Sequence, residues 1–315
     1  MKRVSLVSVV AIMLTVLMFS GLVGAQQRFA YSGSNPGGTW YTMTGGLVKL
    51  LNEELSSNYR VDLLASGGSV INTRRLASGE AALTMSYSSH LWESWNGEGI
   101  LAGRPSDNAR IMFEIYKSDH YFVTLANKGI KSVSDLAGKR VVLGSPGSGS
   151  SDNSRLVFRT LGIDVVESEL SFSEGARALQ DGRVDALGMS GSPAAGVVEL
   201  AATRDILIIP FTDEELDKII GQAPFFEKGF MPANTYEGQT EPVPVFTFSV
   251  YQVASKSVPD DAVYEMMKIS FSENGKKYLS DVHPQWRPMG NNPEAVEALG
   301  VPYHPGAARF WSEQQ

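Results

Sequence analysis

The chain contains no cysteine among its 315 residues. This absence excludes disulfide bonds, thiolate metal centres, a cysteine nucleophile and a lipid-modified cysteine at a processed amino terminus. A chain without such cross-links has to be stabilised by a sizeable hydrophobic core. Its length is sufficient for two domains or for one large one.

Residue patterns for metal, nucleotide and catalytic sites are also missing. The four histidines show no spacing typical of metal ligands. The Gly/Ser-rich segment 144–151 lacks the Lys-Ser/Thr ending of a phosphate loop and the third glycine of a dinucleotide-binding loop. Residues 188–192 (Gly-Met-Ser-Gly-Ser) come near a nucleophile elbow without matching it. We therefore expect no metal site, no cofactor and no catalytic residue.

Positive charge is scarce, because 27 lysines and arginines stand against 34 aspartates and glutamates, for a net charge of −7. A net acidic surface disfavours nucleic acid and anionic membranes as partners, although it allows a local positive cleft. We expect no nucleic-acid partner.

Only one long apolar run is present, at the amino terminus. Lys2 and Arg3 precede the apolar segment 4–19, and residues 23–25 (Val-Gly-Ala) have the small side chains of a cleavage site. These features predict a cleaved secretory signal over residues 1–25, and an uncleaved anchor is the less favoured alternative. Cleavage would remove two positive charges and move the formal charge to −9. The expected location is a bacterial periplasm.

Short apolar segments alternate with amphipathic ones along the rest of the chain, which predicts a largely parallel sheet covered by helices. Two such sheets, joined near residues 120–126 and 245–254, would form a two-lobed protein. Residues 223–244 are rich in proline and glycine and are expected to form a loop or crossing segment. The expected strands are 28–32, 61–65, 81–86, 111–115, 120–126, 140–143, 165–171, 184–189, 206–210 and 245–254, and the expected helices include 154–161 and 174–179.

Four of the expected strand-to-helix loops share one composition of glycine, serine, threonine, asparagine and proline. In parallel sheets such loops lie at the carboxyl ends of the strands, where ligands bind. A helix that starts there leaves backbone N–H groups without intrahelical partners, which suits an anion, here a carboxylate more than a phosphate. Each loop alone is better explained as a capped turn, whereas their shared composition favours a common small anionic ligand. The loops are 33–41, 66–69, 144–151 and 190–193, with 86–89 as a fifth candidate.

Four aromatic residues fall beside or within these loops, namely Trp40, Tyr41, Tyr87 and Tyr251. Large aromatic side chains are usually buried, so core packing explains each of them at least as well as a ligand site does. Tyr41 is the strongest candidate for a site wall, because it is expected on the first helical turn after the first loop.

Several short motifs follow one another in a specific order, and individually each is weak. They are 37–41 (Gly-Gly-Thr-Trp-Tyr), 66–72 (Ser-Gly-Gly-Ser-Val-Ile-Asn), 130–141 (Ile-Lys-Ser-Val-Ser-Asp-Leu-Ala-Gly-Lys-Arg-Val), 147–149 (Gly-Ser-Gly), 185–186 (Asp-Ala) leading into 191–193 (Gly-Ser-Pro), and 302–307 (Pro-Tyr-His-Pro-Gly-Ala). In this order the whole mature chain resembles the TAXI-type solute receptors of tripartite ATP-independent periplasmic (TRAP) transporters.

The resemblance implies an α/β type II periplasmic binding protein with a ligand cleft between two α/β lobes. It implies that a small carboxylate, a C4–C5 dicarboxylate such as 2-oxoglutarate or glutamate, is delivered by a monomeric receptor to TRAP membrane permease subunits driven by an ion gradient. The lobes are expected at 26–121 plus 253–315 and at 122–252. The candidate ligand-binding residues are Ser34, Asn35, Thr39, Tyr41, Ser69, Asn72 and Ser88 in the first lobe and Ser148, Ser150, Ser151, Gly191 and Ser192 in the second.

The chain departs from the TAXI pattern at two places. Many relatives carry an aspartate after the third strand, where residues 86–90 are Ser-Tyr-Ser-Ser-His, and serine stands at position 150 where threonine is common. An acidic group at the first place would bind an ammonium, so its loss favours a dicarboxylate without an amino group. Two other functions stay open: a binding protein of an ABC importer or sensory system, and a periplasmic hydrolase, which the lack of a paired base disfavours.

Overall fold

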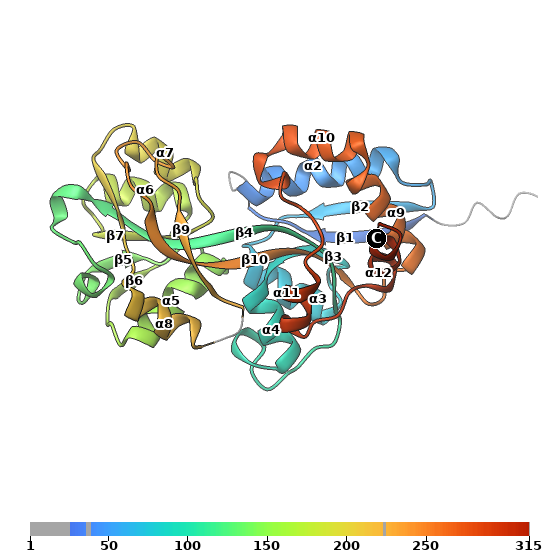
Figure 1. The fold of residues 1–315 in the computed structure, drawn as a ribbon, viewed down its shortest axis with the longest axis horizontal. Coiled ribbons are helices and arrows are strands. Elements are labelled where there is room, and N and C mark those ends of the chain that lie inside the picture. Colours follow the sequence, from blue (N-terminus) through green and yellow to red (C-terminus); the bar gives the residue numbers. More distant parts are fainter. Residues whose placement is uncertain (1–25, 36–38, 223–224, 315) are drawn as a thin grey trace, which may run out of the picture.

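The computed structural model describes residues 26–35, 39–222 and 225–314. The predicted signal and residues 36–38 of the first predicted loop therefore lie outside the described residues. A ten-stranded sheet continues through the whole molecule (Figure 1). Strands β8 (Ile206–Ile209) and β9 (Glu227–Met231) pair with β4 and β10, respectively. The main path runs β2 (Tyr59–Leu64), β1 (Gln27–Ser32), β3 (Leu83–Tyr87), β10 (Val243–Ser255), β4 (Ala109–Leu125), β7 (Ala186–Ser190), β5 (Arg140–Val142) and β6 (Val166–Ser168).

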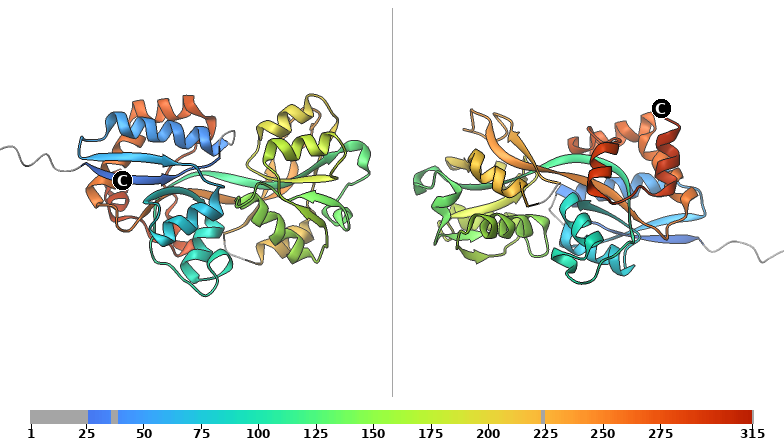
Figure 2. Two further views of the ribbon diagram at one scale, coloured as in Figure 1. Left: turned by 180° about the vertical axis from the view of Figure 1, so that it is seen from behind. Right: turned by 60° about the horizontal axis from the view of Figure 1, so that its bottom comes forward.

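Two long antiparallel strands, β4 and β10, connect two lobes. At one end β10 pairs with β3, beside the parallel strands β1 and β2. At the other end β4 pairs with β7, beside the parallel strands β5 and β6. Helices cover both faces of each parallel part, while β4 and β10 cross between the lobes (Figures 1 and 2). The two α/β lobes are thus as predicted, but they share one continuous sheet instead of having two separate ones.

The predicted strands 111–115 and 120–126 are a single strand in the structure, β4. Lys117, Ser118 and Asp119, which lie between the two predicted strands, stay extended because β10 pairs with them, Lys117 opposite Ser249 and Ser118 opposite Phe248. The strands exchange partners near here, since β7 pairs with β4 from His120 onwards. The predicted lobe boundaries, 121/122 in β4 and 252/253 in β10, lie a few residues beyond this exchange of strand partners. These boundaries stay a prediction.

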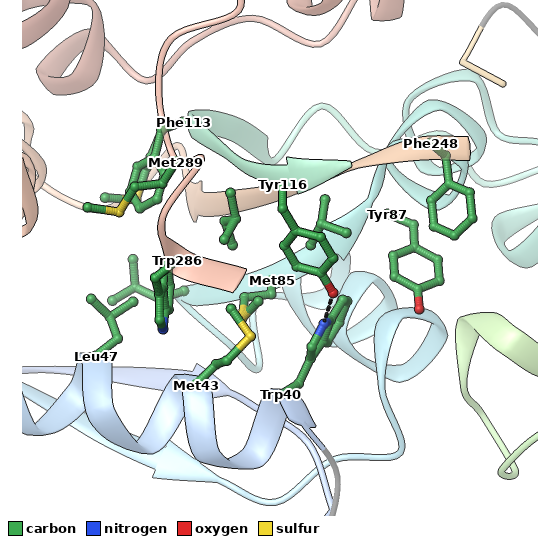
Figure 3. Packing of buried hydrophobic residues seen from close by; sticks show 14 of the residues in the cluster. Trp40, Met43, Leu47, Met85, Tyr87, Phe113, Tyr116, Phe248, Trp286 and Met289 are labelled. Carbon is green, nitrogen blue, oxygen red and sulfur yellow. Dashed lines mark hydrogen bonds between the residues drawn. The ribbon is translucent and has the colours of Figure 1, made fainter. Parts of the chain in front are cut away.

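The first lobe is completed by the carboxy-terminal part of the chain. Helices α2 (Thr39–Glu54), α3 (Ser69–Ser78), α4 (Ser88–Asn96) and η1 (Gly99–Leu101) come from its amino-terminal part. The returning chain adds α9 (Asp260–Phe271), α10 (Glu273–Val282), η4 (Pro284–Trp286), α11 (Pro293–Leu299) and α12 (Pro305–Ser312). Trp286 of η4 is fully buried and lies near Met43 and Leu47 of α2 (Figure 3).

The second lobe contains η2 (Ala126–Lys128), η3 (Val133–Leu136), α5 (Gly149–Leu161), α6 (Phe172–Gln180), α7 (Ala195–Ala201) and α8 (Asp213–Ile220). The helix expected at 154–161 begins earlier, at Gly149, because the Ser148 hydroxyl accepts the Ser151 N–H over 3.2 Å and caps it. Sequence reasoning missed α8, although Thr212 and Glu215 form a capping box. It also missed β9, which lies within the segment expected to be a loop.

Candidate functional site

A cavity of about 190 Å³ lies between the two lobes. This volume suits a small solute more than a drug-sized one. Among the described residues that line it, Glu199 is the only one with a charged side chain, and hydroxyl groups are frequent. The lining consists of Ser34, Thr39, Trp40, Gly67, Gly68, Ser69, Tyr87, Tyr116 and Gln285 together with Ser148, Gly149, Ser150, Phe172, Ser173, Met189, Ser190, Gly191, Ala194, Ala195, Gly196 and Glu199.

Two helices begin at this cavity from opposite lobes, α3 and α5. The N-cap of α3 is Gly68, whose φ of 125° is a conformation that favours glycine. The N-cap of α5 is Ser148, which uses its hydroxyl to hold the Ser151 N–H. The first N–H groups of each helix have no intrahelical partner and carry partial positive charge. These helix termini could hold an anion in the cavity, and none of its described lining residues is a lysine or arginine.

Glycines set how closely the lobes meet beside the cavity. A Cβ atom on Gly149 would lie 2.2 Å from the Tyr87 ring, and one on Gly67 would lie 2.8 Å from the Pro146 carbonyl oxygen. Both distances are too short for real atoms, so any larger residue would force the neighbouring groups to move. The glycine-rich composition recognised in the sequence thus permits direct contact between segments 66–69 and 144–149.

Three aromatic side chains, Trp40, Tyr87 and Tyr116, are among the cavity-lining residues, and they lie close to one another (Figure 3). Trp40 Nε1 donates to the Tyr116 hydroxyl oxygen over 2.9 Å, and the Trp40 ring lies edge-on to the Tyr87 ring. Burial raises the pKa of Tyr87 and of Tyr116 well above the ordinary value, so both stay protonated. Because Trp40 fills an acceptor site of Tyr116, the Tyr116 O–H can donate to a solute.

A buried histidine, His120, orients Ser190 on the second-lobe side. Ser154 Oγ donates to the Leu143 carbonyl over 2.8 Å and accepts from His120 Nε2 over 3.3 Å. Burial lowers the pKa of His120 to about 3, so its ring is neutral and Nδ1 is an acceptor. Ser190 Oγ, 2.9 Å away, therefore donates to Nδ1. The lone pairs of Ser190 Oγ are therefore free to accept a hydrogen bond on the cavity side. The Tyr87 hydroxyl lies next to Ser190 there.

A second buried histidine, His90, connects a cavity serine with the opposite lobe. Its Nδ1 lies 2.7 Å from Ser69 Oγ, and its Nε2 lies 3.2 Å from Asp152 Oδ2. Serine, histidine and aspartate are also the residue types of a serine hydrolase triad. In that triad Nε2 faces the serine and Nδ1 faces the aspartate, whereas here Nδ1 faces Ser69 and Nε2 faces Asp152. Ser69 Oγ also accepts the Tyr87 N–H over 2.9 Å. We assign this group to hydrogen bonding between the lobes.

The same region holds three groups of the kind that bind metal ions. Ligand atoms of His90, Glu93 and Asp152 lie within 4.8 Å of one another. The hydrogen bond between His90 and Asp152 accounts for two of them, and the Glu93 carboxylate accepts the Ile100 N–H over 3.1 Å. Burial raises the pKa of Glu93, which makes it a weaker anionic ligand. Hydrogen bonding explains the group without an ion.

Six of the twelve predicted site residues line the cavity: Ser34, Thr39, Ser69, Ser148, Ser150 and Gly191. The loops that supply them converge as the sequence predicted, because each lies between a strand and a helix at the junction of the lobes. Their contact with a ligand stays a prediction.

Three predicted residues of the first lobe, Asn35, Tyr41 and Asn72, do not line the cavity. Asn35 is exposed, and Tyr41 is 40% exposed because the preceding residue, Trp40, faces the cavity instead. Asn72 is fully buried and joins neighbouring strands, since its Nδ2 donates to the Gly33 and Met85 carbonyls over 3.0 Å each.

Three further predicted residues are also outside the lining. Ser88 is buried, and its hydroxyl has no hydrogen-bond partner among the described residues. The Ser151 hydroxyl donates to Glu169, and the Ser192 hydroxyl donates to Asp119 over 2.5 Å. Tyr251, an aromatic wall candidate, is a core residue that is 1% exposed.

Several lining residues were missed by sequence reasoning. Tyr116 lies inside β4, and Gln285 returns to the cavity from the carboxy-terminal segment, so no local pattern marks either of them. Glu199 lies on α7 and has the appearance of an ordinary surface carboxylate. Phe172 and Ser173 were detectable, because Ser171 and Glu174 form the capping box that begins α6.

The sequence model of the NMT1-like family matches residues 33–314. The chain belongs to the NMT1-like family. Within the residues that the structure describes, no helix of this family member combines the length and apolar composition needed to span a bilayer.

Solved structures show the same fold at low sequence identity. A structure described as a periplasmic transporter aligns with a TM-score of 0.55 at 12% identity, covering 93% of this chain and 99% of that one. MatC from Rhodopseudomonas palustris, with bound malate, aligns with a TM-score of 0.53 at 14% identity, covering 91% and 99%. XAC2383 from Xanthomonas citri, bound to ATP, gives 0.54 at 10% identity, covering 91% and 99%. This NMT1-like protein has the two-lobed fold of type II periplasmic binding proteins.

Proposed function

We propose that the protein is a periplasmic receptor that binds a small carboxylate between its lobes and delivers it to a TRAP-type permease. The observation that carries this proposal is the convergence of the α3 and α5 amino termini on one hydroxyl-lined cavity. A carboxylate would accept hydrogen bonds from both helix termini and from Tyr116, and so would touch both lobes at once. Such a ligand stabilises closure, which is how a receptor signals that it is loaded.

The family and the motif order support the same reading. The NMT1-like match covers almost the whole described chain, and MatC, which shares the fold, has bound malate, a C4 dicarboxylate. The TAXI-type motifs point to a TRAP permease as the partner, in preference to an ABC importer or a sensor. The triad-like contact of His90 does not favour a hydrolase, because Ser69 Oγ already accepts a backbone N–H.

Glu199 bears on which carboxylate is bound. It lies on the cavity wall as the only charged side chain among the described lining residues, and it would attract an ammonium group. Glu199 supports glutamate over 2-oxoglutarate as the proposed solute, whereas the missing aspartate after the third strand supports 2-oxoglutarate. The two solutes respond in opposite directions to Glu199→Gln, because that change removes an attraction for glutamate and a repulsion for 2-oxoglutarate.

Calorimetric titration of ligand-free, refolded protein with glutamate, 2-oxoglutarate, succinate and malate tests this function. We expect at least one to bind with a micromolar Kd, and a glycerol control to give no heat. Glu199→Gln is expected to weaken glutamate binding about twofold to fivefold, the effect of a partly screened surface pair. Absence of binding for all four carboxylates would refute a carboxylate receptor, and tighter glutamate binding in the variant would refute the role of Glu199.

A further inference from the structure

A groove of about 780 Å³ lies on the first lobe, between α3 and the segment 101–108 that leads into β4. None of its described lining residues also lines the solute cavity. More than half of these residues are exposed, so the groove is open to water. A pocket for a small solute buries most of that solute, which an open groove does not do. The groove therefore suits a segment of a larger partner.

Positive charge is concentrated in this groove, although the chain as a whole has a net charge of −7. Arg74 and Arg104 are both exposed, and neither forms an ion pair with a carboxylate of the described residues. The other two cations are each paired with a carboxylate of the groove, over 2.9 and 2.5 Å, in the pairs Arg75–Glu80 and Lys256–Asp107. Guanidinium groups stay charged in proteins. The groove thus carries two positive charges that no described carboxylate compensates.

The two arginines approach the η1 turn from different segments. Arg74 of α3 donates from Nε to the Ile100 carbonyl over 3.2 Å, which holds the side chain and leaves its terminal nitrogens available. Arg104 follows the turn, and its backbone N–H donates to the Leu101 carbonyl over 2.8 Å. A guanidinium group can donate two parallel hydrogen bonds to one carboxylate. Both arginines therefore suit an acidic partner.

Apolar side chains line the same groove. Ile71 and Ala77 come from α3, and Leu101 and Pro105 come from η1 and the segment after it. Ala77 packs on the small core cluster that contains Leu101. A partner gains from covering this apolar surface as well as from the charges. The combination fits a peptide segment with carboxylate and aliphatic side chains better than a simple inorganic anion.

Helix α3 joins the groove to the solute cavity. Ser69 at its start lines the cavity, and Arg74 lies five residues further on, about 7.5 Å along the helix axis. Ile71, between them, also meets the second lobe, because a Cβ atom on Gly147 would lie 2.8 Å from Ile71 Cγ1. A partner in the groove would therefore lie beside the contact between the lobes.

We propose that this groove docks an acidic, aliphatic peptide segment of the membrane partner through Arg74 and Arg104. The inference rests on the proposed function for the identity of that partner, a permease that receives the solute. Attraction between a positive groove and an acidic segment also speeds association and fixes orientation. An anionic membrane is the less favoured occupant, because the chain as a whole is negatively charged and would be repelled by it.

Fluorescence anisotropy with defined peptides tests this docking surface on the full chain. The probe is a short fluorescein-labelled peptide of glutamate, leucine and glycine, and the comparison peptide has lysine in place of glutamate. We expect only the glutamate peptide to bind, and its binding to weaken between about 0.05 M and about 0.5 M NaCl, because salt screens exposed charges. Arg74→Ala combined with Arg104→Ala should weaken binding about twofold to thirtyfold, the loss of two exposed ion pairs.

Arg177→Ala combined with Arg287→Ala is the matched control, because it removes the same charge from two exposed arginines outside the groove. It should keep the wild-type affinity. Arg104→Glu alone is a second test variant, since the Arg104 side chain makes no hydrogen bond to a described residue and its replacement leaves the fold intact. It should also weaken binding of the glutamate peptide, with an unchanged circular dichroism spectrum.

Equal binding of the two peptides by the wild-type protein would overturn the proposal, and so would wild-type affinity in the double alanine variant. Binding to phosphatidylglycerol vesicles that depends on Arg74 and Arg104 would also overturn it, because the occupant would then be a membrane. A dimer in sedimentation velocity that depends on the same arginines would identify a second copy instead. The calorimetric panel is separate: failure of carboxylate binding would remove the proposed function, and the peptide titration would still decide whether the groove binds an acidic segment.

Discussion

At the scale of single residues, the cavity depends on hydroxyl groups whose protons are already directed by buried partners. Ser190→Ala illustrates this, because it would leave His120 Nδ1 without its donor inside the protein. An unsatisfied buried acceptor costs about 1–3 kcal/mol, so we expect a fall of that size in the free energy of unfolding in urea. Ser173→Ala is the control, since Ser173 lines the same cavity but is exposed, and it should change stability by less than about 0.5 kcal/mol. Equal losses in the two variants would contradict this account.

Tyr116 and Tyr41 provide a matched pair for solute binding. Tyr116 lines the cavity with an O–H that Trp40 leaves available, whereas Tyr41 is 40% exposed outside it. Tyr116→Phe should weaken binding of the solute identified by calorimetry by about tenfold to 150-fold, because a hydrogen bond to a charged acceptor contributes about 1.5–3 kcal/mol. Tyr41→Phe should leave the Kd unchanged. If instead Tyr41→Phe weakened binding and Tyr116→Phe did not, Tyr41 would be the tyrosine that contacts the solute, as the sequence predicted.

At the scale of elements, the helix that begins at Gly149 has to approach the Tyr87 ring for the lobes to meet. Gly149→Ala suits a helix intrinsically, but its Cβ would lie 2.2 Å from that ring and should hold the lobes apart. We expect solute affinity to fall at least about tenfold with little loss of helix content. Gly45→Ala on α2, where a Cβ would meet nothing within 4 Å, is the control for calorimetry and circular dichroism. Wild-type affinity in Gly149→Ala would show that this contact does not govern closure.

The elements also show what could be predicted from the sequence. Alternating apolar patterns and glycine-rich loops identified most strands and helices and the loops that supply Ser69, Ser148 and Ser150, because these signals are local. The continuity of β4 through Lys117 was not predictable, since it depends on pairing with β10, which is distant in sequence. The same limit applies to Tyr116 and Gln285, which only the tertiary fold brings to the cavity. Asn72 shows the converse, because a motif residue proved to be a structural hydrogen-bonding group.

At the scale of the whole molecule, the lobes share a core as well as a sheet. Buried aromatic rings connect them in sequence, from Tyr87 to Phe248 with centroids 4.6 Å apart, from Phe248 to Phe246 at 6.2 Å, and from Phe246 to Phe211 at 5.8 Å. Phe211 belongs to the second lobe and Tyr87 to the first, so unfolding either lobe alone would expose part of this chain of rings to water. The lobes should therefore unfold cooperatively.

The distribution of tryptophan makes this cooperativity measurable in the unmodified protein. All five tryptophans lie in segments of the first lobe, so their fluorescence reports that lobe, whereas far-ultraviolet circular dichroism reports both. During urea unfolding, we expect the two signals to give one transition with the same midpoint, because neither lobe can retain its share of the aromatic core without the other. A circular dichroism transition that continues after the fluorescence change is complete would show that the second lobe survives alone, and that the shared sheet and core do not couple the lobes.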